Sequence, residues 1–173
     1  MSGEIHISIF GEKEVPKLEL IRYYIKSNNI NEIKPKAGRL YFVMNSIKVK
    51  VYEYSDIQEL KSKDLLNIQC VIITFDMTKR KSFMDVLDKW IKFLRGVKYN
   101  KNIILFGTGN KEALSMTDEQ EINYLIEITG IPGEFFDLRN MDEQHICKLF
   151  DKLIKKVFED AKSNANKKDC NIF

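Results

Sequence analysis

The sequence predicts an α/β fold with three layers, in which a mostly parallel six-stranded sheet with one antiparallel edge strand carries helices on both faces. Strand-like and helix-like segments alternate along the chain, which is typical of parallel strands joined by crossover helices. Residues 71–75 and 103–106 are continuously apolar, as expected of strands buried on both faces. A hairpin pattern at 40–54 accounts for the antiparallel edge strand.

In the first half of the chain, apolar periodicity predicts one strand and one helix before the hairpin. Alternating isoleucines predict a strand at 5–9 that ends at Gly11. An apolar stripe over residues 18–25 predicts a helix that ends near 27–29. The further predictions in this half are a loop at 31–39, strands at 40–44 and 47–54, and a short polar helix at 56–67.

The second half predicts helices that alternate with strands. The predicted elements are a strand at 71–75, a helix over 83–94 that ends at Gly96, a strand at 103–106 that ends at Gly107, a helix at 117–129, a strand at 134–136 and a helix at about 142–161. Thr117 and Gln120 fit a capping box, and Gly130 fits a C-cap. We therefore expect a domain at 1–161 and a flexible, lysine-bearing tail at 162–173.

Composition indicates a single globular domain. The chain has 173 residues, of which 44% are hydrophobic and 31% charged, so one core can stabilise it. The net charge of +3 is too small to indicate nucleic-acid binding. Three cysteines without a CxxC pair fit a reducing compartment rather than zinc or disulfides. With no signal peptide or membrane span recognisable, we expect a cytoplasmic protein.

The predicted ligand site lies beyond the carboxyl ends of the strands, as in other open α/β sheets. This rim would consist of residues 11–17, 76–79, 107–111 and 137–140. No activated serine or cysteine and no carboxylate pair in a recognisable geometry is evident. His6 and His145 fall on separate predicted elements. We therefore expect neither catalytic residues nor metal ligands.

Five stretches of the chain resemble motifs of the Ras superfamily of small GTPases, and the resemblance covers roughly residues 4–160 and the C-terminus. They are residues 11–18 (GEKEVPKL), 51–56 (VYEYSD), 75–83 (FDMTKRKSF), 109–114 (GNKEAL) and 170–173 (CNIF). The third is the most similar. The resemblance implies a monomeric G-domain that binds GTP or GDP and contacts protein effectors or regulators through its switch-like faces.

Residues 11–18 stand where the family has its phosphate loop, GxxxxGK[ST]. Gly11 and Lys17 match that pattern. Pro16, which has no N–H, replaces the second glycine, and Leu18 replaces the hydroxyl that binds Mg²⁺. The alternative interpretation is that Pro16 is simply the first residue of a helix, where proline is favoured.

The resemblance also implies altered charges around the phosphates and the metal. Glu12 and Glu14 add negative charge beside the phosphates. Lys36 takes the place of a switch-loop threonine that binds Mg²⁺, so it would repel the ion while offsetting phosphate charge. Glu53 keeps the carboxylate of the DxxG motif but is one methylene longer. Since both side-chain Mg²⁺ contacts are absent, we expect no Mg²⁺ and no tightly bound cofactor, with GTP or GDP binding left open.

Water positioning and guanine recognition are altered as well. Asp56 replaces the glycine of DxxG, and Ile57 replaces the glutamine that orients the attacking water. Ile57 instead fits the apolar face of a short helix. The NKxD motif retains Asn110 and Lys111, but its aspartate is Ala113. Losing that bidentate contact should cost about 3 kcal/mol or more of base discrimination.

We therefore predict a pseudoGTPase that acts as a membrane-tethered interaction module in signalling or trafficking. The alternative is a divergent GTPase that binds GTP or GDP and hydrolyses GTP slowly, with Lys17, Lys36 and backbone donors in place of Mg²⁺. The nucleotide-site equivalents are Gly11, Lys13, Lys17, Leu18, Glu53, Asn110 and Lys111.

The C-terminal residues resemble a C-a-a-X prenylation signal. Cys170 is followed by Asn171, Ile172 and a terminal Phe173 that favours geranylgeranyl. Lysines just upstream would add about 1 kcal/mol each near an anionic surface. These features predict a lipid anchor on Cys170 and a peripheral location at the cytosolic face of a membrane. The alternative is a chance cysteine at the fourth-last position.

Overall fold

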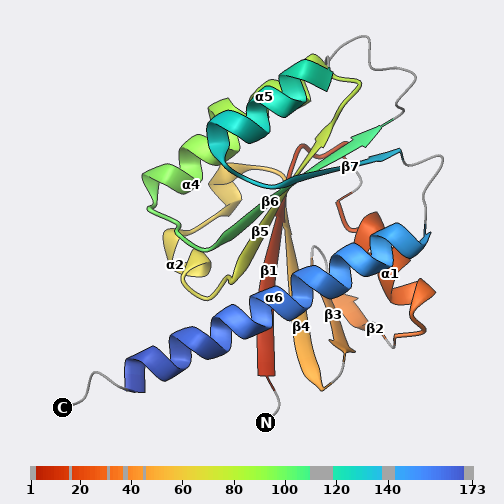
Figure 1. Cartoon of the computed structure of the whole chain (residues 1–173), viewed down its shortest axis with the longest axis vertical. Helices are drawn as coiled ribbons and strands as arrows, with labels where there is room; N and C mark the ends of the chain where they lie inside the picture. The colour runs from red at the N-terminus through yellow and green to blue at the C-terminus, as the bar shows by residue number, and fades with distance from the viewer. Residues whose placement is uncertain are drawn as a thin grey trace.

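A computed structural model describes residues 3–15, 17–30, 32–36, 39–44, 46–109, 119–137 and 143–169, and these residues form one sheet between two layers of helices (Figure 1). The seven strands are arranged in the order β2-β3-β4-β1-β5-β6-β7. They are β1 (Gly3–Phe10), β2 (Glu32–Lys36), β3 (Arg39–Met44), β4 (Ile47–Tyr54), β5 (Cys70–Asp76), β6 (Asn102–Gly109) and β7 (Gly133–Asp137). The α/β fold class, with its mostly parallel sheet, is confirmed.

One face of the sheet packs against α1 (Glu19–Ser27) and α6 (Glu143–Asp169), which lie side by side in Figure 1. The isoleucines at positions 5, 7 and 9 point into this layer, because side chains alternate along a strand. Tyr24 ties the two helices together by donating a hydrogen bond to Asp151 (2.5 Å). The predicted periodicity of β1 and α1 is thus confirmed.

The other face carries the helices that follow β4, β5 and β6. They are the single turns η1 (Ile57–Glu59) and α2 (Ser62–Leu65), the helix formed by α3 (Arg80–Asp85), the π-helical η2 (Val86–Ile91) and α4 (Lys92–Gly96), and α5 (Glu119–Thr129). Trp90 is the centre of this layer, with its ring stacked on that of Phe10 at 5.1 Å. Gly130 ends α5 with a φ of +64°, as its predicted C-cap role requires.

The edge of the sheet differs from the prediction. Residues 32–36, expected in a loop, form the edge strand β2 and pair antiparallel with β3, so the sheet has seven strands rather than six. A polar segment can do this because an edge strand makes hydrogen bonds on one side only, which also tolerates Pro35. The turn between β3 and β4 is confirmed, with Ser46 at a φ of 65°.

Three other boundaries are corrected. The predicted helix at 56–67 is two separate turns, because Leu60 between them is extended. Strand β6 does not stop at Gly107 but continues to Gly109, since neighbours on both sides satisfy its backbone. Helix α6 continues past 161 to Asp169, so most of the segment expected to be an aperiodic tail is helical. Lysine and alanine favour such propagation once a helix has formed.

Candidate functional site

The loop between β1 and α1 lies at the carboxyl ends of β1 and β5, where the rim was predicted. Gly11 begins it and donates a backbone hydrogen bond to Tyr54 (3.3 Å). A Cβ on Gly11 would lie 2.3 Å from the hydroxyl and 2.6 Å from the carbonyl oxygen of Thr74. The position thus requires glycine because another strand passes so close.

The backbone of this loop is hydrogen-bonded to itself. The N–H of Val15 donates to the carbonyl of Glu12 (3.1 Å), and the N–H of Lys17 donates to the carbonyl of Val15 (2.8 Å). A phosphate cradle works when successive N–H groups point toward the anion. In this arrangement two of those donors are already occupied.

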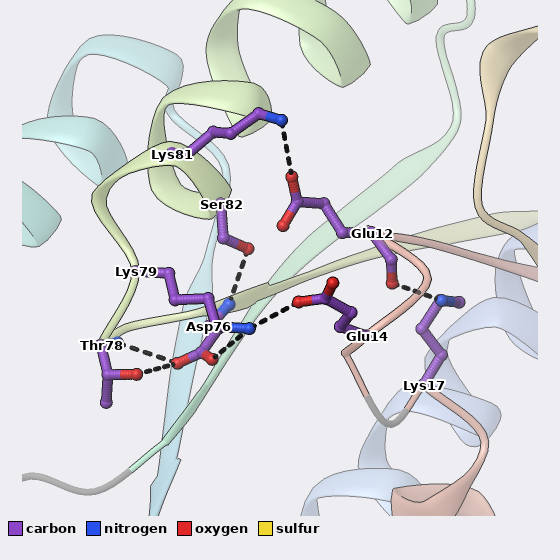
Figure 2. A network of polar contacts seen from close by, with 8 residues as sticks. All are labelled: Glu12, Glu14, Lys17, Asp76, Thr78, Lys79, Lys81 and Ser82. Carbon is purple, nitrogen blue, oxygen red and sulfur yellow. Dashed lines mark hydrogen bonds and ion pairs between the residues drawn. The ribbon is translucent and has the colours of Figure 1, made fainter.

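The side chain of Lys17 is turned into its own loop. Its ammonium donates to the carbonyl of Glu12 (2.6 Å) and lies 3.4 Å from both the carbonyl of Val15 and the carboxylate of Glu53 (Figure 2 draws the first contact). Burial lowers the pKa of Lys17, and the negative charge of Glu53 opposes that shift. The charge of this fully buried side chain is therefore neutralised within the protein.

The glutamates of the loop face lysines that follow β5 (Figure 2). Glu14 pairs with Lys79 at 2.7 Å, and the carboxylate of Glu12 lies 4.0 Å from the ammonium of Lys81. Burial and the neighbouring carboxylate of Asp85 raise the pKa of Glu12. Two ion pairs thus connect the loop to the segment that opens α3.

Leu18 and Glu53 stand at positions that the resemblance aligns with Mg²⁺ contacts. The Leu18 side chain is buried in the core with α1 and α6, and carbon cannot ligate a cation. The Glu53 carboxylate, a ligand type that Mg²⁺ accepts, is paired with Lys17. Across the part of the chain that the structure describes, no group of three or more His, Cys, Asp or Glu side chains is placed to hold a metal ion.

The turn after β5 is organised by its own side chains. Asp76 accepts hydrogen bonds from the N–H (2.9 Å) and hydroxyl (2.7 Å) of Thr78. The backbone N–H of Asp76 in turn donates to the buried hydroxyl of Ser82 (2.9 Å). Phe83 then packs edge-on against Phe75 at 5.8 Å. The polar and aromatic residues of this stretch therefore hold the start of α3 on the sheet.

The structure brings together only some of the predicted site residues. Gly11, Lys17 and Glu53 meet at the loop, Lys13 is exposed, and Leu18 is buried away from the rim. Ile57 packs against the core of the second layer, as the helix-face interpretation predicts. Lys36 ends β2. Other residues of the predictions lie outside the described residues: Pro16, Asn110, Lys111, Ala113, Thr117 of the predicted capping box, and Cys170 with the three residues after it.

Sequence reasoning missed the lysines that face the loop. Lys79 ends the rim segment 76–79 that the strand order predicts, Lys81 lies two residues beyond it, and acidic residues at 12 and 14 occur on the neighbouring loop. That complementary charge was the available signal, but a separation of 65 residues between Glu14 and Lys79 hides it. The fold is what makes the two segments neighbours.

Comparison with protein-family models matches residues 7–159 of the chain to the Ras family. The matched range begins in β1, ends in α6 and contains both the loop and the turn described above. Among the described residues, no helix has the length and apolar character needed to cross a membrane.

Proposed function

Because this chain belongs to the Ras family, we propose that it is a pseudoGTPase, a family member that acts through its surface and no longer holds GTP with Mg²⁺. The observation that carries the proposal is the internal use of the phosphate-binding groups. Lys17 is neutralised by Glu53 and by carbonyls of its own loop, and two loop N–H groups are bonded internally. Phosphate would have to displace all of these contacts.

Charge near the loop also disfavours a nucleotide. Glu12 and Glu14 are carboxylates beside the position of the phosphates, and their lysine partners come from the opposite segment. A bound triphosphate would compete with both glutamates for Lys79 and Lys81. The competition is unfavourable without a divalent cation, and Leu18 cannot provide a ligand for one.

Hydrolysis would need an oriented water and stabilisation of the transferred phosphoryl group. Ile57 stands at the water-orienting position, and its side chain packs against the core of the second layer. Asp56 accepts a hydrogen bond from the N–H of Gln58 (3.1 Å) and so serves to begin η1. These contacts support a structural role for both residues.

Two experiments would test the nucleotide proposal. In the first, the purified protein is denatured and any released nucleotide is separated by chromatography. In the second, the native protein is titrated with a fluorescent GTP analogue with and without Mg²⁺. The expected result is no stoichiometric nucleotide and no Mg²⁺-dependent binding. Stoichiometric GDP, or submicromolar binding that requires Mg²⁺, would establish the alternative of a divergent working GTPase. That alternative draws its support from the retained Gly11, Lys17 and Glu53.

Ras family proteins generally interact with effectors and regulators, and we propose that this chain does so from a membrane. The hairpin and switch-like faces at β2 to β4 would contact the partner, and prenylated Cys170 with nearby lysines would provide the tether. A Cys170→Ser variant should move from membranes to the soluble fraction of cells. The matched control is Cys147→Ser, which changes a thiol within α6 and should leave the distribution unchanged. Retention of the Cys170→Ser variant on membranes would exclude prenyl anchoring.

A further inference from the structure

A recess separate from the phosphate loop lies between the sheet and α2, with a volume of about 440 Å³. Strands β1, β3 and β4 contribute His6, Arg39, Tyr52 and Tyr54, and α2 contributes Lys63 and Asp64. Side chains alternate along β4, so Tyr52 and Tyr54 face this recess while Glu53 between them faces Lys17. The recess is thus on the opposite side of β4 from the Lys17–Glu53 pair.

Aromatic rings form the walls of the recess and are fixed in place. The His6 and Tyr52 rings lie 5.7 Å apart, and the Tyr52 hydroxyl is 3.2 Å from His6 Nδ1. Tyr54 is supported from behind by an edge-on contact with Phe10 at 5.8 Å. Burial raises the pKa of both tyrosines, which keeps their phenols uncharged at neutral pH. These surfaces suit a flat aromatic group, because offset and edge-on ring contacts are favourable.

The charged side chains that line the recess include Arg39, Lys63 and Asp64, and the Glu4 carboxylate beside it bonds to His6 Nε2 (2.6 Å) and Lys50 (2.8 Å). The Arg39 guanidinium lies 5.7 Å from the centre of the Tyr52 ring, and no ion pair to Arg39 or Lys63 is found within the described ranges. The Asp64 carboxylate already accepts a hydrogen bond from the backbone N–H of Lys61 (3.3 Å). Two cations therefore remain available to an anionic ligand, and guanidinium is well suited to a carboxylate.

We propose that this recess binds a small aromatic anion, with its ring against Tyr52 and His6 and its carboxylate between Arg39 and Lys63. The volume is within the range of sites for small molecules, about 300–1,000 Å³. The recess forms because α2 is a single turn, which is too short to cover this face of β1, β3 and β4. The inference is independent of the nucleotide proposal, since none of these side chains belongs to the phosphate loop.

The test is an NMR titration of the ¹⁵N-labelled full chain with 2-naphthoate, and with 2-naphthamide as the neutral analogue. We expect saturable shifts at the amides of His6, Tyr52 and Asp64, with a Kd on the order of 1 mM, as ordinary ligand efficiency gives for this size. The amide should bind at least fivefold more weakly. Equal binding of the two compounds, no saturable shift, or shifts centred on Gly11 and Lys17 would overturn the proposal.

Variants distinguish specific binding in the recess from nonspecific attraction of the anion to a basic protein. Arg39→Gln should weaken 2-naphthoate binding at least fivefold. Lys48→Gln is the matched control, because it removes the same charge from an exposed position of β4 that does not line the recess. Lys63→Gln, on the exposed surface of α2, provides a second test should Arg39→Gln disturb the sheet. Equal losses in Lys48→Gln and both recess variants would contradict the proposal.

Discussion

Two neighbouring segments of the rim match the family's motifs to different degrees. The turn after β5 keeps the pattern DxTxxxSF that resembles the family, and its Asp76, Thr78 and Ser82 bond to one another. The loop at residues 11–18 keeps only Gly11 and Lys17 of its pattern. The matching residues are thus those with contacts inside the protein, whereas positions 16 and 18, whose contacts in the family pattern would be to nucleotide and metal, do not match it.

The two loop residues that match the family pattern also have contacts inside the protein. Gly11 is needed because Thr74 lies against it, and Lys17 holds the loop by bonding to its carbonyls. Both residues would therefore be needed for the structure of the loop even if no nucleotide were bound. Mutations can test whether each segment is held by internal contacts.

The largest loss of stability is expected from a substitution at Gly11, which lies against β5. A Gly11→Ala change places a methyl group 2.3 Å from the Thr74 hydroxyl and 2.6 Å from its backbone oxygen, so the strands must separate. We expect a loss of about 3 kcal/mol in the free energy of unfolding, at the upper end for overpacking. Urea denaturation measures it. Gly96→Ala is the control, because nothing lies within 4 Å of that position; equal losses would contradict the account.

Glu53→Gln should be the next most damaging change. It leaves the buried Lys17 ammonium with carbonyl partners but without its counter-charge. Removing one partner of a buried pair costs about 3–5 kcal/mol, and we expect about 2 kcal/mol because Glu53 is 28% exposed. Adding Lys17→Met should recover part of the loss. A double variant no more stable than Glu53→Gln would show that the pair does not set the stability of the loop.

An intermediate effect is expected in the turn after β5. Asp76→Ala removes the acceptor for two hydrogen bonds from Thr78 and should cost about 1–2 kcal/mol, as a lost helix cap does. Thermal unfolding followed by circular dichroism gives the comparison. Asp88→Ala, at an exposed position of η2, is the control and should change little. If Asp76→Ala left the unfolding midpoint unchanged, the hydrogen bonds within this turn would not stabilise it, which would contradict the contrast drawn between the two segments.

The smallest effect belongs to the ion pair between Glu14 and Lys79. Both side chains are well exposed, and such pairs contribute little because water and salt screen them. Glu14→Gln should leave the unfolding midpoint unchanged in high salt, with at most a slight decrease in low salt. A large, salt-independent loss would mean that this pair, rather than the Lys17–Glu53 pair, holds the loop closed.

The sequence predicted the fold where patterns are local and repeated. Continuous apolar residues marked β5, and the apolar stripe over residues 18–25 marked α1. It missed β2 because a polar edge strand depends on its partner β3 for stability rather than on an apolar pattern of its own. The place of the rim followed from strand order. The pairing of Glu14 with Lys79 did not, because it depends on side chains far apart in the chain.

The most direct measurement is thermal unfolding of the purified chain in EDTA and in excess Mg²⁺ with GTP or GDP. A ligand that binds the folded state at 100 times its Kd stabilises by about 2.7 kcal/mol, which in a domain of this size raises the midpoint by about 5–10 °C. If the phosphate-binding groups are satisfied by Glu53 and the loop itself, the midpoints will agree within about 1 °C. A rise of several degrees that requires both Mg²⁺ and nucleotide would contradict this account.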